Sequence, residues 1–146
     1  MNVFTYGSLM FDPVWATVVA GLGYRSAPAT LTGYRRFAVS GQSYPGVIAA
    51  PGGEIEGRLY YDVDEADLAR LDAFEGGDYA RIAVDTRVID DGRELSVPAG
   101  LYLYLPAERL ESRDWDPEWF AREGIHRFIR DYCPTPEGPA PKDGSG

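Results

Sequence analysis

The sequence predicts an α+β fold with a closed or strongly curved β-sheet. Segments with the alternating pattern of strands outnumber segments with helical spacing, and glycine and proline residues punctuate them. No internal repeat is visible. The chain has 146 residues, which is the length of one domain and is enough to bury a single core.

The first segment with a strand pattern leads directly into a glycine turn. Val3 to Tyr6 have the β-branching and alternation of a buried strand, and Gly7-Ser8-Leu9 follow. Asp12-Pro13 then has the composition of a helix N-cap and first turn. Strand, glycine turn and helix together leave backbone amides free to bind anionic or carbonyl oxygens, although the same pattern also fits a simple turn.

The next elements are a short helix and a run of strands. The helix begins at Asp12 and is expected to end near Gly21. Four short strands are then expected at 29–34, 36–39, 47–50 and 57–63, with glycine and proline residues as the turns between them.

A second helix is predicted from its capping residues. Asp64 is the expected N-cap, and apolar residues at helical spacing continue to Phe74-Glu75, where Gly76-Gly77 end the helix.

Two further strands, 81–90 and 95–105, are predicted to form a hairpin. Asp91-Gly92 between them suits a tight turn with positive φ. In the second of these strands Tyr102 and Tyr104 share one face, opposite the neighbouring leucines.

The C-terminal part is expected to contain a helix and a tail. The helix begins at Asp116-Pro117 and places aromatic and aliphatic residues at helical spacing. Residues 134–146 are rich in proline and glycine and contain no large apolar side chain, so disorder is expected there. The folded domain is accordingly expected to span residues 1–133.

Charge and composition exclude several classes of function. A net charge of −9 opposes binding to nucleic acids and to anionic membrane surfaces. The sequence has neither an apolar run long enough to span a membrane nor the pattern of a secretory signal. Cys133 is the single cysteine and has no neighbours at metal-ligand spacing. We expect a cytoplasmic protein without metal or cofactor; nothing in the sequence sets its oligomeric state.

Glu75 is the candidate catalytic residue. It lies at the expected C-terminus of a helix, where the helix dipole disfavours a negative charge. A carboxylate partly desolvated by Phe74 and nearby tyrosines would have a raised pKa and would suit a general base. The alternative is that Glu75 is a solvated residue of the last turn.

The motifs in combination resemble the γ-glutamylcyclotransferase-like family, which includes γ-glutamylamine cyclotransferases and AIG2-like proteins. They are Tyr6-Gly7-Ser8-Leu9, Gly57-Arg58-Leu59-Tyr60, and Leu71-Asp72-x-Phe74-Glu75-Gly76 with Tyr79-x-Arg81, in this order. The resemblance spans about residues 1 to 133 and implies a small mixed barrel with flanking helices. It also implies that a γ-glutamyl compound is cyclised to 5-oxoproline with release of an amine.

The resemblance assigns roles to particular residues. Glu75 matches the family's catalytic glutamate, and Tyr6, Gly7, Ser8 and Leu9 match its substrate-binding loop. Tyr79 and Tyr104 are candidate walls of the pocket, although ordinary packing explains them equally well.

Three further interpretations concern Ser8, Arg81 and the protein as a whole. Ser8 as a nucleophile would need a histidine, and His126 lies on the last predicted helix without a nearby acid. Arg81 is either structural or positions Glu75 or a substrate carboxylate. The rival to an enzyme is a non-catalytic domain of the same fold that binds a small molecule or another protein.

Overall fold

The computed structural model describes residues 1–21 and 23–132. Cys133 and the predicted disordered tail at 134–146 lie outside the described residues. The strands are β1 (Val3–Thr5), β2 (Ser26–Ala38), β3 (Pro45–Tyr60), β4 (Tyr79–Asp90) and β5 (Arg93–Tyr104). The helices are η1 (Ser8–Met10), α1 (Asp12–Val18), α2 (Glu65–Glu75), η2 (Ala107–Arg109), α3 (Pro117–Trp119), η3 (Phe120–Gly124) and α4 (Ile125–Tyr132).

The five strands form one mixed sheet that closes on itself. Its order is β1-β3-β2-β4-β5, and the sheet closes because β1 pairs in parallel with β5 and antiparallel with β3. The hairpins β2-β3 and β4-β5 are antiparallel, whereas β2 and β4 meet at a single pair, Thr30 and Arg87. The predicted α+β class with a closed or strongly curved sheet is confirmed.

Two hydrophobic clusters divide the core between the barrel and the helices. The inner cluster draws side chains from all five strands, including Phe4, Leu31, Leu59, Val88 and Leu101. The outer cluster joins the other face of the sheet to the helices, and its members include Val3, Trp15, Tyr60, Leu71, Phe74, Tyr102, Tyr104 and Phe128. Because successive side chains of β5 point to opposite faces, Leu101 belongs to the inner cluster and Tyr102 to the outer one.

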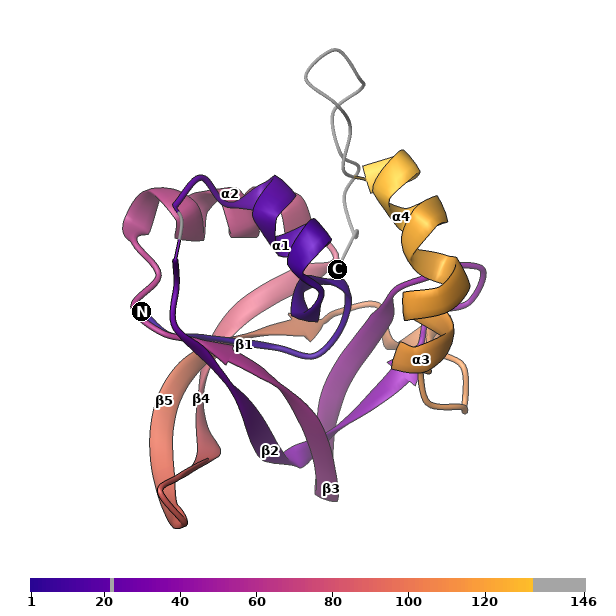
Figure 1. The fold of residues 1–146 in the computed structure, drawn as a ribbon. Coiled ribbons are helices and arrows are strands. Elements are labelled where there is room, and N and C mark those ends of the chain that lie inside the picture. Colours follow the sequence, from indigo (N-terminus) through magenta and orange to yellow (C-terminus); the bar gives the residue numbers. More distant parts are fainter. Residues whose placement is uncertain (22, 133–146) are drawn as a thin grey trace.

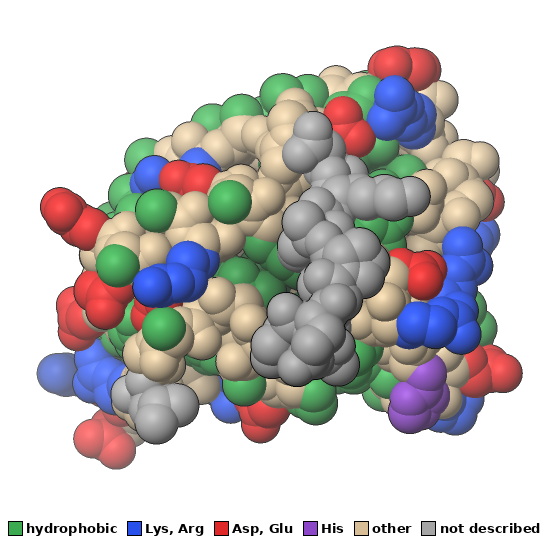
Figure 2. All heavy atoms as spheres, turned by 90° about the horizontal axis from the view of Figure 1, so that it is seen from above, with side chains coloured by type: hydrophobic (Ala, Val, Ile, Leu, Met, Phe, Trp, Pro, Cys, Tyr) green, Lys and Arg blue, Asp and Glu red, His purple; other side chains and the backbone are tan. Residues whose placement is uncertain are grey.

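The helices cover one side of the sheet. α1 and α2 lie next to each other over it, and α4 stands beside them (Figure 1). Trp15 of α1 stacks on Tyr60 of β3 with ring centroids 3.6 Å apart, which fixes α1 to the barrel. Figure 2 looks onto this helical side and shows charged side chains of both signs toward the periphery, with hydrophobic side chains between them.

The prediction of four short strands between residues 29 and 63 is wrong. The structure has two long strands there, because pairing between β2 and β3 resumes on both sides of the residues that were expected to break it. Gly33 has φ +86° and the register shifts between Thr32 and Tyr34, so this glycine forms an irregularity within β2. Gly52, with φ +82°, is likewise accommodated within β3.

The helices and the second hairpin follow the prediction more closely. Asp64 caps α2, its side chain accepting the Asp67 amide, and Asp91 and Gly92 form the hairpin turn with φ of 49° and 74°. Asp12 is wrong as an N-cap: Phe11 occupies that position, and α1 ends at Val18 instead of near Gly21.

The predicted last helix is divided into three parts. Asp116 is its N-cap, as expected, but the π-helical turn η3 separates α3 from α4. Among the described residues, no helix is long and apolar enough to cross a membrane.

Candidate active site

Glu75 is the last residue of α2 and is buried between the helices and the barrel. α2 stops there because Gly76 takes φ +77°, and its amide bonds back to the Asp72 carbonyl. Glu75 is 3% exposed, and its Oε2 has no hydrogen-bond partner among the described residues. The alternative of a solvated residue at the helix end is therefore wrong.

A small cavity adjoins this carboxylate. Its lining joins the first strand, the following loop, α2 and β5, and consists of Phe4, Thr5, Tyr6, Gly7, Leu9, Glu75 and Tyr102. The volume is about 10 Å³, which is space for about one water molecule. A larger ligand therefore requires the lining to move apart.

The surroundings of Glu75 favour its protonated form. Burial raises the pKa of Glu75 well above its usual value, and the negative charge of Asp72 raises it further. A carboxyl group with a raised pKa can accept and return a proton near neutral pH, which is what general acid–base catalysis requires.

The Tyr6-Gly7-Ser8-Leu9 loop is held in place at Tyr6. The Tyr6 hydroxyl donates to the Tyr102 carbonyl oxygen at 2.6 Å, and the Tyr6 carbonyl accepts from Arg36 Nη1 at 3.0 Å. The loop then forms η1, and Ser8 in it is fully buried. Gly7 has a φ of −131°, so the loop does not use the positive φ that glycine permits.

Tyr79 and Tyr104 do not line the Glu75 cavity, but Tyr79 lies within the electrostatic influence of Glu75 and packs on Tyr104. Their rings are 5.2 Å apart in an edge-to-face arrangement, and the Tyr79 hydroxyl donates to the Pro45 carbonyl at 2.8 Å. The pKa of Tyr79 is raised by burial and by the nearby charges of Tyr6 and Glu75. Tyr104 packs directly on Gly46, where a Cβ would lie 2.6 Å from the ring.

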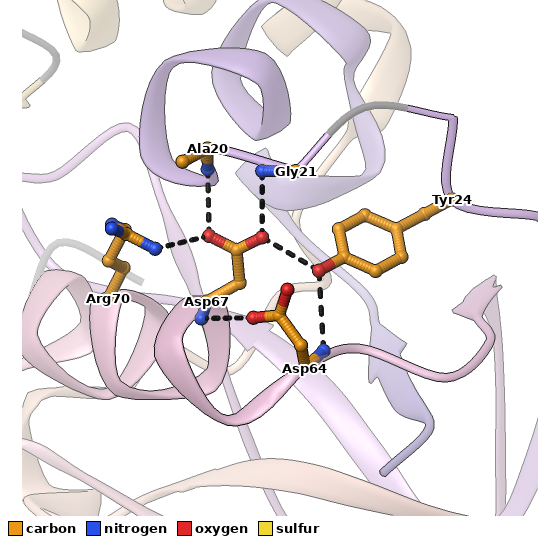
Figure 3. A network of polar contacts seen from close by, with 6 residues as sticks. All are labelled: Ala20, Gly21, Tyr24, Asp64, Asp67 and Arg70. Carbon is orange, nitrogen blue, oxygen red and sulfur yellow. Dashed lines mark hydrogen bonds and ion pairs between the residues drawn. The ribbon is translucent and has the colours of Figure 1, made fainter.

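The N-terminal turn of α2 is fixed by a network around Asp67 (Figure 3). Its carboxylate is 1% exposed and accepts hydrogen bonds from the Ala20 amide at 2.7 Å and the Gly21 amide at 2.9 Å. The Tyr24 hydroxyl and Arg70 Nη1 also donate to it, at 2.7 and 2.8 Å. These bonds tie the segment after α1 to the helix that carries Glu75.

The structure therefore brings together most of the predicted site residues. Tyr6, Gly7, Leu9 and Glu75 share one cavity. Sequence reasoning missed three lining residues, Phe4, Thr5 and Tyr102. The position of Tyr102, two residues before Tyr104 and on the same face of its strand, was the signal that could have identified it.

Two other candidates lie outside the cavity lining. Arg81 forms an ion pair with Asp72 at 2.9 Å. His126 is exposed on α4. Within residues 1–21 and 23–132, no group of three or more potential ligands is arranged to hold a metal ion.

The fold and the site together define a class of protein. The family model described as gamma-glutamyl cyclotransferase, AIG2-like, matches residues 3–117, and the chain belongs to this family. The similarity to Protein AIG2 C of Arabidopsis thaliana is 31% identity over 131 residues, which cover 90% of this chain and 78% of that protein.

Solved structures share the fold. A solution structure of an Arabidopsis thaliana protein is 26% identical, with a TM-score of 0.66, and the match covers 88% of this chain and 77% of that one. A structure named gamma-glutamyl cyclotransferase has a TM-score of 0.61 at 16% identity, covering 97% of this chain and 94% of that one. An AIG2-like protein of Mus musculus has the same TM-score at 24% identity, with coverage of 86% and 91%.

Proposed function

We propose that this protein is a γ-glutamyl cyclotransferase that converts a γ-glutamyl amine or γ-glutamyl amino acid to 5-oxoproline and a free amine. The buried carboxylate of Glu75, with an oxygen that has no hydrogen-bond partner among the described residues, carries this proposal. Such a group is costly to bury without a partner, and a substrate amine is a chemically suitable partner.

The reaction is an intramolecular transfer of an acyl group. The neutral α-amine of the substrate attacks its own γ-carbonyl carbon and forms the five-membered lactam. Glu75 removes the proton that the attacking nitrogen loses and returns it to the leaving nitrogen as the γ-carbon–nitrogen bond breaks. One γ-glutamyl amide thus gives one lactam and one amine, with neither oxidation nor added water.

The loop from Tyr6 to Leu9 supplies positioning and charge stabilisation. Backbone amides of this loop would bind the α-carboxylate or the oxyanion that develops on the γ-carbonyl. Holding the flexible γ-glutamyl chain in its folded form also lowers the entropic barrier to ring closure. Tyr79 and Tyr104 extend the wall of the site beyond Glu75. We place this reaction in the cytoplasm.

The test is to incubate the purified protein with a panel of γ-glutamyl amines and γ-glutamyl amino acids and to quantify 5-oxoproline by mass spectrometry. Glu75→Gln keeps the size of the side chain and removes the base, so product should form with the wild type and fall by at least ~100-fold in this variant. Glu65→Gln is the matched control, because Glu65 is exposed on the same helix. Undiminished turnover in Glu75→Gln would refute the mechanism.

The alternative is a non-catalytic domain that binds a small molecule or another protein. The cavity of about 10 Å³ must open before a substrate or any other small-molecule ligand can enter, so turnover is what distinguishes the two functions. Binding of panel members without product, at an affinity that Glu75→Gln leaves unchanged, would support it.

A further inference from the structure

Asp72 connects the helix that carries Glu75 to two strands of the barrel. It lies three residues before Glu75 on α2, so the two side chains are neighbours on the helix surface. Arg81 of β4 donates to both carboxylate oxygens of Asp72, from Nε at 2.9 Å and from Nη2 at 3.1 Å. The Tyr102 hydroxyl of β5 donates to Asp72 Oδ1 at 2.7 Å.

Tyr102 continues this connection to the substrate loop. Its side chain lines the Glu75 cavity, and its backbone carbonyl accepts the hydroxyl of Tyr6 at 2.6 Å. A continuous chain of hydrogen bonds therefore joins the loop, β5, α2 and β4. Within this series of hydrogen bonds, Asp72 is the residue of α2 that accepts bonds from both β4 and β5.

We propose that Asp72 is a positioning residue of the active site, which fixes the last turn of α2 against β4 and β5 and holds a second carboxylate beside Glu75. Arg81 sets how much of that negative charge Glu75 experiences. This inference rests on the proposed function, because Asp72 and Arg81 are assigned roles that matter for catalysis only if Glu75 is the base.

Titratable groups from four elements interact with Glu75. Asp72 of α2 raises the pKa of Glu75, and the charge of Glu75 in turn raises the pKa of Tyr6 in the loop, Tyr79 of β4 and Tyr102 of β5. Burial raises the pKa of each of the three tyrosines, so their hydroxyls are neutral when Glu75 titrates. Asp72 therefore contributes the negative charge, since its own pKa is lowered by hydrogen bonds from Arg81 and Tyr102 that outweigh the effect of its partial burial.

The experiment follows the titration of Glu75 directly, by NMR of the side-chain carboxyl in protein labelled with ¹³C-glutamate. Glu75→Gln assigns the signal by its disappearance. In Asp72→Asn the midpoint should move to lower pH by about one unit, because a neighbouring negative charge is removed. Asp85→Asn is the matched control, an exposed aspartate on β4, and should leave the midpoint unchanged.

A second variant separates this effect from a general loosening of the fold. Arg81→Met removes the counter-charge of Asp72, so the midpoint of Glu75 should move to higher pH, and Arg81→Lys should restore it toward the wild-type value. Loosening would expose Glu75 to water and lower its midpoint in both Asp72→Asn and Arg81→Met. Movement of both midpoints in the same direction, or an unchanged midpoint in folded Asp72→Asn, would overturn the proposal.

The titration also distinguishes this inference from the proposed function. It requires no turnover, so it gives a result even with a protein that converts no member of the substrate panel. With an active protein, the acidic limb of kcat/KM should move to lower pH in Asp72→Asn, together with the NMR midpoint.

Discussion

Glu75 is an ionisable side chain in surroundings that oppose its ionisation. Burial and the negative charge of Asp72 both raise its pKa. A group whose pKa is higher in the folded than in the unfolded chain favours folding at low pH, and this contribution is lost as the pH rises through the folded-state pKa. Ionisation of Glu75 should therefore reduce the stability of the folded protein at higher pH.

The first prediction concerns this cost. Glu75→Gln removes the ionisation and should raise the melting temperature relative to the wild type at high pH, by about 2–4 °C for each 1 kcal/mol in a domain of this size. The difference should shrink as the pH falls toward the unfolded-state pKa of glutamate, about 4.3. Thermal unfolding followed by circular dichroism across this range measures it.

Glu65→Gln provides the control for this prediction. Glu65 is exposed on the same helix, so its substitution should change the melting temperature less than Glu75→Gln does at high pH. A pH-independent effect of Glu75→Gln would show that burial does not raise the pKa of Glu75.

The sequence identified Glu75 and the loop but not the residues that hold them. Short motifs that are visible in a single sequence contain Glu75, Tyr6 and Gly7. The link from Tyr102 to Asp72 spans 30 residues and depends on how β5 lies against α2. Hydrophobic alternation places Tyr102 on the helical face of β5, but it does not specify the partner on the helix.

At the scale of elements, α2 is held at both ends by aspartates. Asp67 binds the segment after α1, and Asp72 binds β4 and β5 (Figure 3 shows the first of these). Gly21 is close enough to Asp67 that a Cβ would lie 2.7 Å from Oδ2, so this position suits glycine. The helix that carries Glu75 is thus constrained along its length and not only at its cap.

The second prediction tests the Asp67 network. Asp67→Asn should lower the free energy of unfolding by about 2–3 kcal/mol at neutral pH, because it weakens charge-assisted hydrogen bonds to a buried carboxylate. Urea unfolding measures this. Asp85→Asn, an exposed aspartate, should change stability by less than about 0.5 kcal/mol.

The effect of Asp67 should also depend on pH. Burial alone would raise the pKa of Asp67, but the hydrogen bonds that it accepts outweigh burial and lower the pKa to about 2. The stabilisation is therefore fully present above the unfolded-state pKa of about 3.9 and is lost as the pH falls toward 2. An equally large difference between wild type and Asp67→Asn at the lowest pH would contradict this account.

Secondary structure could be predicted from the sequence where the local residue preference agrees with the conformation that the folded protein requires. The Asp64 cap and the Asp91-Gly92 turn are examples. The sequence predicts breaks at residue 35 and between residues 50 and 57, because the nearby Gly33 and Gly52 are typical of turns. In the barrel each is an irregularity inside a long paired strand, and the pairing that makes this possible is a tertiary property that the local sequence does not contain.

At the scale of the whole molecule, the closure of the barrel is uneven. The hairpins β2-β3 and β4-β5 pair over most of their lengths, whereas β2 and β4 meet at Thr30 and Arg87. Arg87 also forms ion pairs with Glu54 and Glu94, which link three strands near this position. The junction, or seam, between β2 and β4 therefore has the fewest paired residues of any in the barrel wall.

The third prediction follows from this seam. Backbone amides that face it on β2 and β4 should exchange with deuterium faster, by about 10-fold or more, than amides within the two hairpins, because fewer ladder bonds protect them. Hydrogen exchange followed by NMR resolves the individual amides. Equal protection on both sides of the seam and within the hairpins would contradict the expectation.

The whole fold places Glu75 and the loop from Tyr6 to Leu9 where the barrel core meets the helical layer, and we propose that this carboxylate moves the proton during ring closure. The most direct test is the pH dependence of kcat/KM for release of 5-oxoproline, compared with the NMR titration of Glu75 in the same protein. We predict an acidic limb whose midpoint coincides with that of Glu75, and its loss together with activity in Glu75→Gln. An acidic limb that persists in an active Glu75→Gln variant would contradict the account.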